Sequence, residues 1–172
     1  MPQIEANGIP PDLQTAVVCT TLMRLGTHMA TIFDQRFSAM GITQASFRTL
    51  LALCELEGIS DGGIAPSRLA DYLLIDRATV TVLVSRLIAQ GAVERLPGPN
   101  RRTHRLRLTP AGQAKITEVI PSAITLADET LAGIPPEDLS RLLAVLTQTE
   151  TRLRGLDAIM PRLSDTDTDS SR

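Results

Sequence analysis

The fold is decided by the stretch from Pro66 to Thr109, PSRLADYLLIDRATVTVLVSRLIAQGAVERLPGPNRRTHRLRLT. Its first half contains two short helical patterns that meet at Ile75-Asp76. Pro66 suits the first position of one helix. Asp76 can cap the start of the next, RATVTVLVSRLIAQ, which we expect to end at Gly91. Two short helices joined by a tight turn form the helix-turn-helix pattern.

Beyond Gly91 the spacing of apolar residues changes from about 3.6 to about 2 residues. Val93 to Leu96 is one expected strand. Residues 104–108 (HRLRL) alternate polar and apolar, which turns the leucines toward a core and the arginines outward. The segment PGPN between them is typical of a turn. The sequence therefore predicts a β-hairpin, directly after the helix pair, with arginines at its tip and on its outer face.

The segments on either side of this region are predicted to be helical. An apolar stripe with steps of four and three residues runs from Val18 to Ile32 and predicts a long first helix. Thr43 is a suitable N-cap for a second, more apolar helix. Pro121 is expected to kink or end the helix that follows the hairpin, and a last helix is expected to run to about Arg154.

Charge is distributed unevenly along the chain, although its formal net charge is only −2. Between Arg68 and Arg107 there are eight arginines and three carboxylates, whereas the rest of the chain has nine basic and sixteen acidic residues. One part of the surface is therefore suited to an anionic partner. Aromatic residues make up only 2% of the chain, so the expected core is aliphatic.

Composition also restricts the class of protein. Cys19 and Cys54 lie in apolar helical patterns, so we expect no disulfide scaffold, and the cytoplasm is the expected location. We expect no secretory signal, and no apolar run approaches the ~18 residues of a membrane span. The cysteines and the two histidines lack the spacing of a zinc site, and no Ser-x-x-Lys, His-Glu-x-x-His or phosphate-loop motif occurs. We therefore expect neither an enzyme nor a metal or cofactor site.

The helix RATVTVLVSRLIAQ is expected to bury one face and expose the other. The residues that share the apolar face are Val80, Leu83, Val84, Leu87 and Ile88. Facing outward is a mixture of cationic, hydroxyl and small apolar side chains: Arg77, Thr79, Thr81, Val82, Ser85 and Arg86. Such side chains suit base edges and phosphates in the major groove of DNA. The hairpin arginines would lie along the adjacent backbone or reach into a narrow minor groove.

This ordered run of motifs resembles the MarR family of bacterial and archaeal transcriptional regulators. The resemblance covers about residues 12–155. Its matching segments, in chain order, are Gly41-Ile42-Thr43-Gln44, Leu69-Ala70, RATVTVLVSRL, Gly91-Ala92-Val93-Glu94-Arg95 and NRRTHRLRLTPAG. It implies a mainly α fold with a small β-hairpin wing, in which a winged helix-turn-helix core is flanked by N- and C-terminal dimerisation helices.

The resemblance also implies a homodimer that binds a palindromic operator in double-stranded DNA, usually as a repressor. The expected divisions are a flexible arm at 1–11, a dimerisation helix at 12–40, the winged helix-turn-helix DNA-binding domain at 41–112, C-terminal dimerisation helices at 113–155 and a partly disordered polar tail at 156–172. Arg102 matches the wing arginine that enters the minor groove. The full set of implied DNA contacts is Ser67, Arg68, Arg77, Ala78, Thr79, Thr81, Val82, Arg86, Arg101, Arg102 and Arg105.

Three positions depart from the family pattern. Asn100 stands where an Asp usually precedes the wing arginine by two residues, and an amide can accept a hydrogen bond but cannot form an ion pair. Val82 often corresponds to a polar or basic residue, so direct readout there would rest on a thymine methyl group. Ala65 replaces the usual Ser or Thr cap, at a cost of ~1 kcal/mol of helix stability.

Many family members release DNA when a phenolic acid or another small organic anion binds between the dimer helices and the DNA-binding lobe. The candidate residues for such an effector pocket in this sequence are His28, Met29, Phe33, Phe47 and Arg48. Each also fits a purely structural interpretation, with the two phenylalanines in the core and His28 at the surface.

Two alternative functions stay open. Peroxide-sensing members carry a reactive cysteine about where Cys19 lies, but Met23 and Phe33 replace the tyrosines that hold its thiolate, and no basic residue immediately precedes it. Core packing is therefore the preferred interpretation of Cys19. The second alternative, a protein-interaction module without DNA binding, would need an acidic or apolar recognition helix and a shortened wing, and neither occurs.

Overall fold

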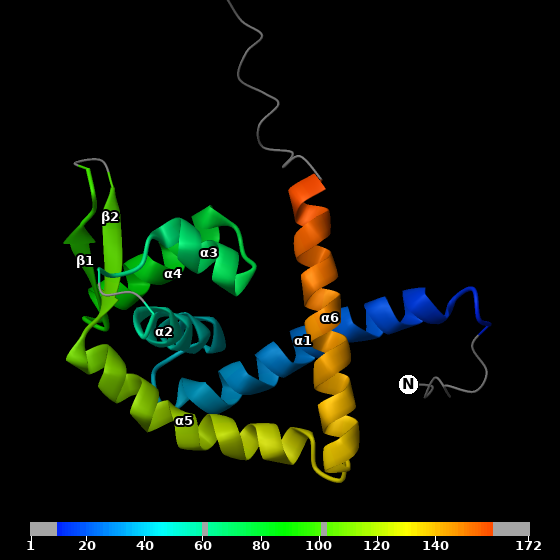
Figure 1. Ribbon diagram of the computed structural model, residues 1–172. Helices are drawn as coiled ribbons and strands as arrows, with labels where there is room; N and C mark the ends of the chain where they lie inside the picture. The colour runs from blue at the N-terminus through cyan, green and yellow to red at the C-terminus, as the bar shows by residue number, and fades with distance from the viewer. Residues whose placement is uncertain (1–9, 60–61, 101–102, 160–172) are drawn as a thin grey trace, which may run out of the picture. The chain divides into compact units, whose positions relative to one another are not determined.

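The structure is a computed structural model that describes residues 10–59, 62–100 and 103–159. The chain forms two compact units that divide after Ala127. The elements in chain order are α1 (Gln14–Ser38), α2 (Gln44–Glu57), α3 (Pro66–Leu73), α4 (Arg77–Ala89), β1 (Val93–Pro97), β2 (His104–Leu108), α5 (Pro110–Thr130) and α6 (Pro136–Ile159) (Figure 1). This mainly helical order with one antiparallel hairpin confirms the predicted fold class.

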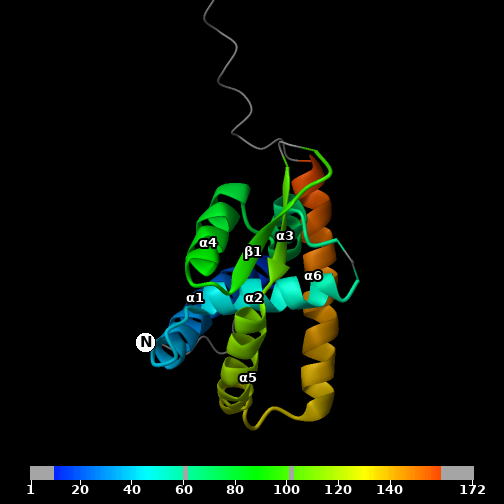
Figure 2. The ribbon, with the colours of Figure 1, turned by 90° about the vertical axis from the view of Figure 1, so that its left-hand side faces the viewer.

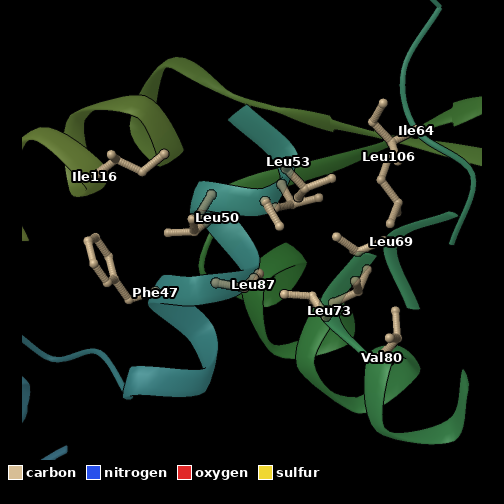
Figure 3. Close-up of a cluster of buried hydrophobic side chains, with 14 of the residues drawn as sticks. Phe47, Leu50, Leu53, Ile64, Leu69, Leu73, Val80, Leu87, Leu106 and Ile116 are labelled. Atoms are coloured by element: carbon tan, nitrogen blue, oxygen red, sulfur yellow. The ribbon is translucent and has the colours of Figure 1, made fainter. Parts of the chain in front are cut away.

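The core of the first unit is built around α2, whose apolar side chains pack with those of α3, α4 and the hairpin (Figure 3). Leu50 and Leu53 of α2 are fully buried, as are Leu69 of α3, Leu87 of α4 and Leu106 of β2. Each such side chain contributes about 1.5–3 kcal/mol by leaving water. This aliphatic core, which the scarcity of aromatic residues predicted, holds the helix pair and the hairpin against one central helix.

The end of α1 is joined to the start of α2 by an aromatic group. Phe37 is fully buried, and its ring meets those of Phe33 and Phe47 edge-on, with centroid distances of 5.5 and 5.2 Å. At the start of α2 the Thr43 hydroxyl oxygen accepts a hydrogen bond from the backbone amide of Ser46 (3.1 Å). The predicted N-cap of this helix is thus confirmed.

The turn of the helix-turn-helix runs from Leu74 to Asp76. Leu74 has a φ of 56°, in the left-handed region that disfavours side chains with a Cβ atom. Asp76 then caps α4, because its Oδ1 accepts a hydrogen bond from the backbone amide of Thr79 (2.8 Å). This confirms the predicted cap. At the start of α3, Ala65 provides no side-chain cap, as the sequence indicated.

The two predicted strands pair antiparallel as a hairpin. Val93 pairs with Leu108 and Pro97 pairs with His104, so β1 extends one residue beyond the expected Leu96. Near the tip, the Gly98 amide donates a hydrogen bond to the Thr103 carbonyl (3.0 Å). A Cβ atom on Gly98 would lie 2.7 Å from the Thr103 carbonyl carbon, so this close approach requires glycine.

Two helix ends differ from the sequence-based expectation. α5 continues past Pro121 to Thr130, so this proline does not end the helix, although α5 bends part-way along its length (Figure 1). Proline removes one hydrogen bond from the helix, but the turns on both sides keep theirs. α6 runs to Ile159 rather than stopping near 155. The added turn contains Leu156, Ala158 and Ile159, so the polar tail begins later than the expected boundary.

The apolar stripe of α1 is exposed rather than packed inside its own chain. Phe37 is the one buried residue of α1. The stripe itself, made of Val18, Leu22, Leu25, Met29 and Ile32, is exposed. Cys19 is exposed too, which corrects its preferred interpretation as a core residue. Cys19 lies beside the exposed stripe, far along α1 from the buried Phe37, which explains the difference.

Among the described helices, α1 alone is long and apolar enough to cross a membrane, by length and composition only. The expectation that no apolar run approaches the length of a membrane span is therefore corrected for this segment. Core helices of soluble proteins have the same properties, and Arg24 lies near the middle of α1, where a charge in a bilayer is costly. We therefore expect an apolar partner to cover the exposed stripe of α1.

Candidate nucleic-acid interface

The predicted recognition helix α4 lies beside β1 of the hairpin (Figures 1 and 2). It buries Val80, Val84 and Leu87, and Leu83 and Ile88 are half-buried, so the predicted inner face is confirmed. All six α4 residues predicted to meet DNA are exposed: Arg77, Ala78, Thr79, Thr81, Val82 and Arg86. One face of α4 therefore packs against the core, and the opposite face is exposed. The major groove of DNA is wide enough to admit a helix exposed in this way.

The hydroxyl groups of two threonines on the open face are engaged within α4. Thr79 Oγ1 donates to Asp76 Oδ2 (2.6 Å), and Thr81 Oγ1 donates to the backbone carbonyl of Arg77 (2.8 Å). The hydroxyl and amide hydrogen bonds from Thr79 hold the pKa of Asp76 below its usual value. A hydroxyl whose proton is used in this way can still accept a hydrogen bond from a base amino group.

The first turn of α3 carries the other predicted helix contacts. Ser67 and Arg68 are exposed, while Leu69 and Ala70, which follow directly, are buried. The backbone amides of a first helical turn have no partners within the helix and attract anions. Both predicted residues thus lie on the surface, at a position where a phosphate group can approach the helix.

The wing arginines divide into three groups. Arg101 and Arg102, the predicted contacts at the tip, lie outside the described residues. Arg107 of β2 is exposed. Arg105 is half-buried, and its Nη1 donates a hydrogen bond to the carbonyl of Gly63 (2.9 Å). Arg105 therefore secures the hairpin to the loop before α3 with part of its guanidinium group, and its remaining N–H groups are available to a phosphate.

Two further contacts, which the sequence did not reveal, hold the outer edge of β2. Ile64 exchanges two backbone hydrogen bonds with Leu106, both 2.8 Å long. The Glu57 carboxylate, at the end of α2, accepts a hydrogen bond from the Leu108 amide at Oε1 (2.7 Å). Glu57 and Ile64 are thus positioning residues for the hairpin. No local pattern marks them, because their partners lie more than forty residues away along the chain.

The predicted effector residues do not surround the cavity that the first unit contains. This cavity of about 310 Å³ is lined by Met40, Gly41, Ile42, Leu50, Leu87, Gln90, Ala92, Ala111 and Lys115. Phe47 is 4% exposed and belongs to the core, and Phe33 packs against that core. His28, Met29 and Arg48 are exposed. The effector site built from these five residues stays a prediction.

Within the described ranges, no three His, Cys, Asp or Glu side chains lie close enough together to hold a metal ion. Cys54 is partly buried, and its Sγ donates to Gln113 Oε1 (3.6 Å). This contact joins only two side chains and does not form a larger polar cluster. The chemistry of the described surface is concentrated on α4, α3 and the hairpin.

Comparison with known proteins identifies this arrangement. The model of the MarR family matches residues 40–103, from the end of α1 through the helix pair and the hairpin. The HTH-type transcriptional regulator PecS of Dickeya dadantii is 27% identical over 143 residues, which are 83% of this chain and 85% of PecS. These similarities place the winged helix-turn-helix segment of this chain, residues 40–103, in the MarR family. Members of the MarR family are transcription regulators and not enzymes, and the chain is accordingly placed in transcription regulation.

Solved structures of MarR-family and related regulators share the fold. BpsR of Bordetella bronchiseptica is 27% identical, with a TM-score of 0.68, and the match covers 77% of this chain and 92% of BpsR. A mutant of Escherichia coli MarR complexed with operator DNA has a TM-score of 0.69 at 21% identity, over 82% of this chain and 99% of the other. The individual DNA contacts of this chain stay predictions.

Proposed function

We propose that this MarR-family chain is a cytoplasmic, homodimeric repressor that binds a palindromic operator in double-stranded DNA. The observation that carries the proposal is the exposure of all six predicted α4 contacts on a helix whose opposite face is buried. α4 would enter the major groove. Ser67 and Arg68 would contact phosphate, and Arg102 would enter the adjacent minor groove. The complex of E. coli MarR with operator DNA, which has the same fold, supports this arrangement.

The homodimer is supported by two helices with exposed apolar faces. In the first unit this is the stripe of α1, and in the second unit it is α6, whose exposed side chains include Leu142, Leu143, Leu146 and Leu153. Unpartnered apolar surface of this extent is typical of an interface. A second copy of the chain is the occupant we propose, because two recognition helices are needed to bind two symmetric half-sites.

Release by a small organic acid is the regulatory part of the proposal. DNA binding by BpsR, which is 27% identical to this chain, is regulated by 6-hydroxynicotinic acid. We propose a phenolic or aromatic acid as the class of effector, bound near His28, Met29, Phe33, Phe47 and Arg48. His28 and Arg48 are the exposed groups of this set that can donate a hydrogen bond to a carboxylate.

The proposal is tested by selecting bound duplexes from a random pool with the full-length protein. We expect a palindromic motif whose half-site centres lie about 10 base pairs apart. We also expect an affinity that falls steeply with salt, because arginines that contact phosphates displace counterions. A pool that yields no enriched duplex at 50 mM salt would overturn the proposal.

Two kinds of variant distinguish residues that hold the protein on any duplex from residues that select the base sequence. Arg102→Ala should weaken binding to every duplex and lower the salt slope by about 1, because one cation that displaces counterions from the minor groove is lost. Arg77→Ala and Thr81→Ala should instead change which bases are selected. Arg141→Ala, on α6 and paired with Asp138 (3.1 Å), is the matched arginine control. If Arg102→Ala binds its operator as tightly as the parent, the assignment of the wing is wrong.

A further inference from the structure

We propose that α4 selects thymine bases at the centre of each half-site, through contacts of Val82 and Ala78 with their 5-methyl groups. This inference rests on the proposed binding of double-stranded DNA and specifies which bases the interface favours. In B-DNA the thymine methyl projects into the major groove, where α4 would lie. The base preference of α4 depends on which of its groups remain available to a base pair.

The centre of the open face of α4 is apolar. With 3.6 residues per turn, Ala78 and Val82 lie one turn apart on the side opposite the buried Val80, Val84 and Leu87. The side chain of Val82 is 66% exposed, so its two methyl groups protrude where a base pair would approach most closely. An exposed valine at this point gains free energy only by contact with another apolar group.

The two threonines beside this centre cannot donate hydrogen bonds to a base in this conformation. A hydroxyl has one proton, and those of Thr79 and Thr81 are given to Asp76 Oδ2 and to the Arg77 carbonyl. What each threonine still offers is a methyl group and an acceptor oxygen. The N-terminal half of the open face therefore presents methyl groups and acceptors at its centre.

An A·T pair is the base pair that matches this set of groups. In the major groove it displays the thymine methyl and the adenine N6 amino group, which is a donor. Guanine displays two acceptors, N7 and O6, which need donors from the protein. The arginines of α4 are Arg77, at its start, and Arg86, in its last turn, and both are exposed. Guanine is thus expected toward the edges of the contacted bases, with thymine between.

The test uses the duplex selected by the full-length protein and removes methyl groups from the DNA. Each thymine of a half-site is replaced, one at a time, by deoxyuridine, which lacks the 5-methyl group and keeps the same hydrogen-bonding groups. At one or two central positions the dissociation constant should rise about fourfold, the equivalent of one buried methyl group. Deoxyuridine outside the contacted bases should have no effect.

A matching change in the protein assigns the contact to Val82. Val82→Ala should bind the thymine duplex less tightly and should lose the response to deoxyuridine at the same position, since the two changes remove the same contact. Val82→Thr, which keeps one of the two methyl groups and nearly the same shape, should retain part of that response. Thermal unfolding of both variants verifies that the fold is intact, which exposure of the side chain predicts.

The outcomes distinguish this inference from the proposed function. A protein that enriches no duplex overturns the proposed function and this inference together. A protein that enriches an operator but tolerates deoxyuridine at every position leaves the proposed function in place and overturns the thymine readout. The readout is also overturned if Val82→Ala and the parent respond equally to deoxyuridine, or if the selected half-site has no central thymine.

Discussion

The carboxylate of Asp76 accepts hydrogen bonds from both the backbone amide and the hydroxyl of Thr79, at 2.8 and 2.6 Å. The first bond fixes the start of α4, and the second engages the hydroxyl proton of Thr79. Asp76, in the turn of the helix-turn-helix, therefore both begins α4 and limits the hydrogen-bond donors that its exposed face presents. Under the proposed function, helix stability and base recognition are linked at this residue.

Asp76 should give the fold a pH-dependent increment of stability. Its pKa in the folded chain lies below the usual 3.8, because Thr79 donates two hydrogen bonds to the charged form. The increment is fully present above the unfolded pKa and is lost as the pH falls through the lower, folded pKa. Asp76→Asn, which keeps an acceptor and does not titrate, should lose it. Urea unfolding of the parent and of Asp76→Asn gives the difference between their unfolding free energies at pH 7 and at pH 3. This difference should be smaller at pH 3.

An equal difference at both pH values would contradict this assignment.

Leu74→Gly should leave stability unchanged or raise it by up to about 1 kcal/mol. The left-handed conformation of Leu74 costs about 1–2 kcal/mol with a side chain present and nothing with glycine, while glycine loses about 0.5–1 kcal/mol in backbone entropy. Leu74 is 48% exposed, so little packing is lost. Its neighbour Leu73 is buried and helical, and Leu73→Gly should cost about 3 kcal/mol or more. Urea denaturation of the pair measures both effects, and equal losses would show that the turn is unstrained.

Glu57→Ala should loosen the hairpin more than Glu57→Gln does. The carboxylate of Glu57 accepts a hydrogen bond from the Leu108 amide, and alanine leaves that amide without its acceptor, at a cost of about 1 kcal/mol. Glutamine can still accept through its amide oxygen. Hydrogen exchange of the Leu108 amide is the direct measurement, and it should accelerate in Glu57→Ala. Operator affinity should fall in the same order, because the wing is less well positioned, and unchanged exchange would refute the role given to Glu57.

The features that the sequence predicts well are local. Thr43 and Asp76 were identified as caps because a capping side chain and its amide partner lie within three residues of each other. The alternation of HRLRL likewise predicted the buried Leu106 and the exposed Arg107, since neighbouring side chains of a strand face opposite sides. These patterns, together with the order of motifs, were enough to predict the winged helix-turn-helix and its open face.

The features that the sequence did not predict depend on contacts between residues far apart in the chain, or on whether an apolar helix face is covered by the same chain. The contacts of Glu57 with Leu108 and of Arg105 with Gly63 join segments that come together only in the folded chain. For Pro121 the sequence left a kink and a helix end open, and the structure shows a continuous helix that bends. For Cys19, an apolar pattern indicates that a helix face needs cover but not whether the cover comes from the same chain.

The apolar stripe of α1 is the surface that a second copy of the chain would cover. Leu25 lies in the exposed stripe of α1, and Thr27 lies on the opposite side of the same helix, two residues away. If a second copy covers the stripe, Leu25→Glu places a carboxylate in an apolar interface twice per dimer. The dissociation constant of the dimer should then rise by more than about 100-fold. Sedimentation equilibrium should show monomers for Leu25→Glu and dimers for Thr27→Glu, which introduces the same charge outside the stripe. Operator affinity should fall with dimerisation in the first variant and persist in the second. A Leu25→Glu protein that remains dimeric would show that the copies meet elsewhere.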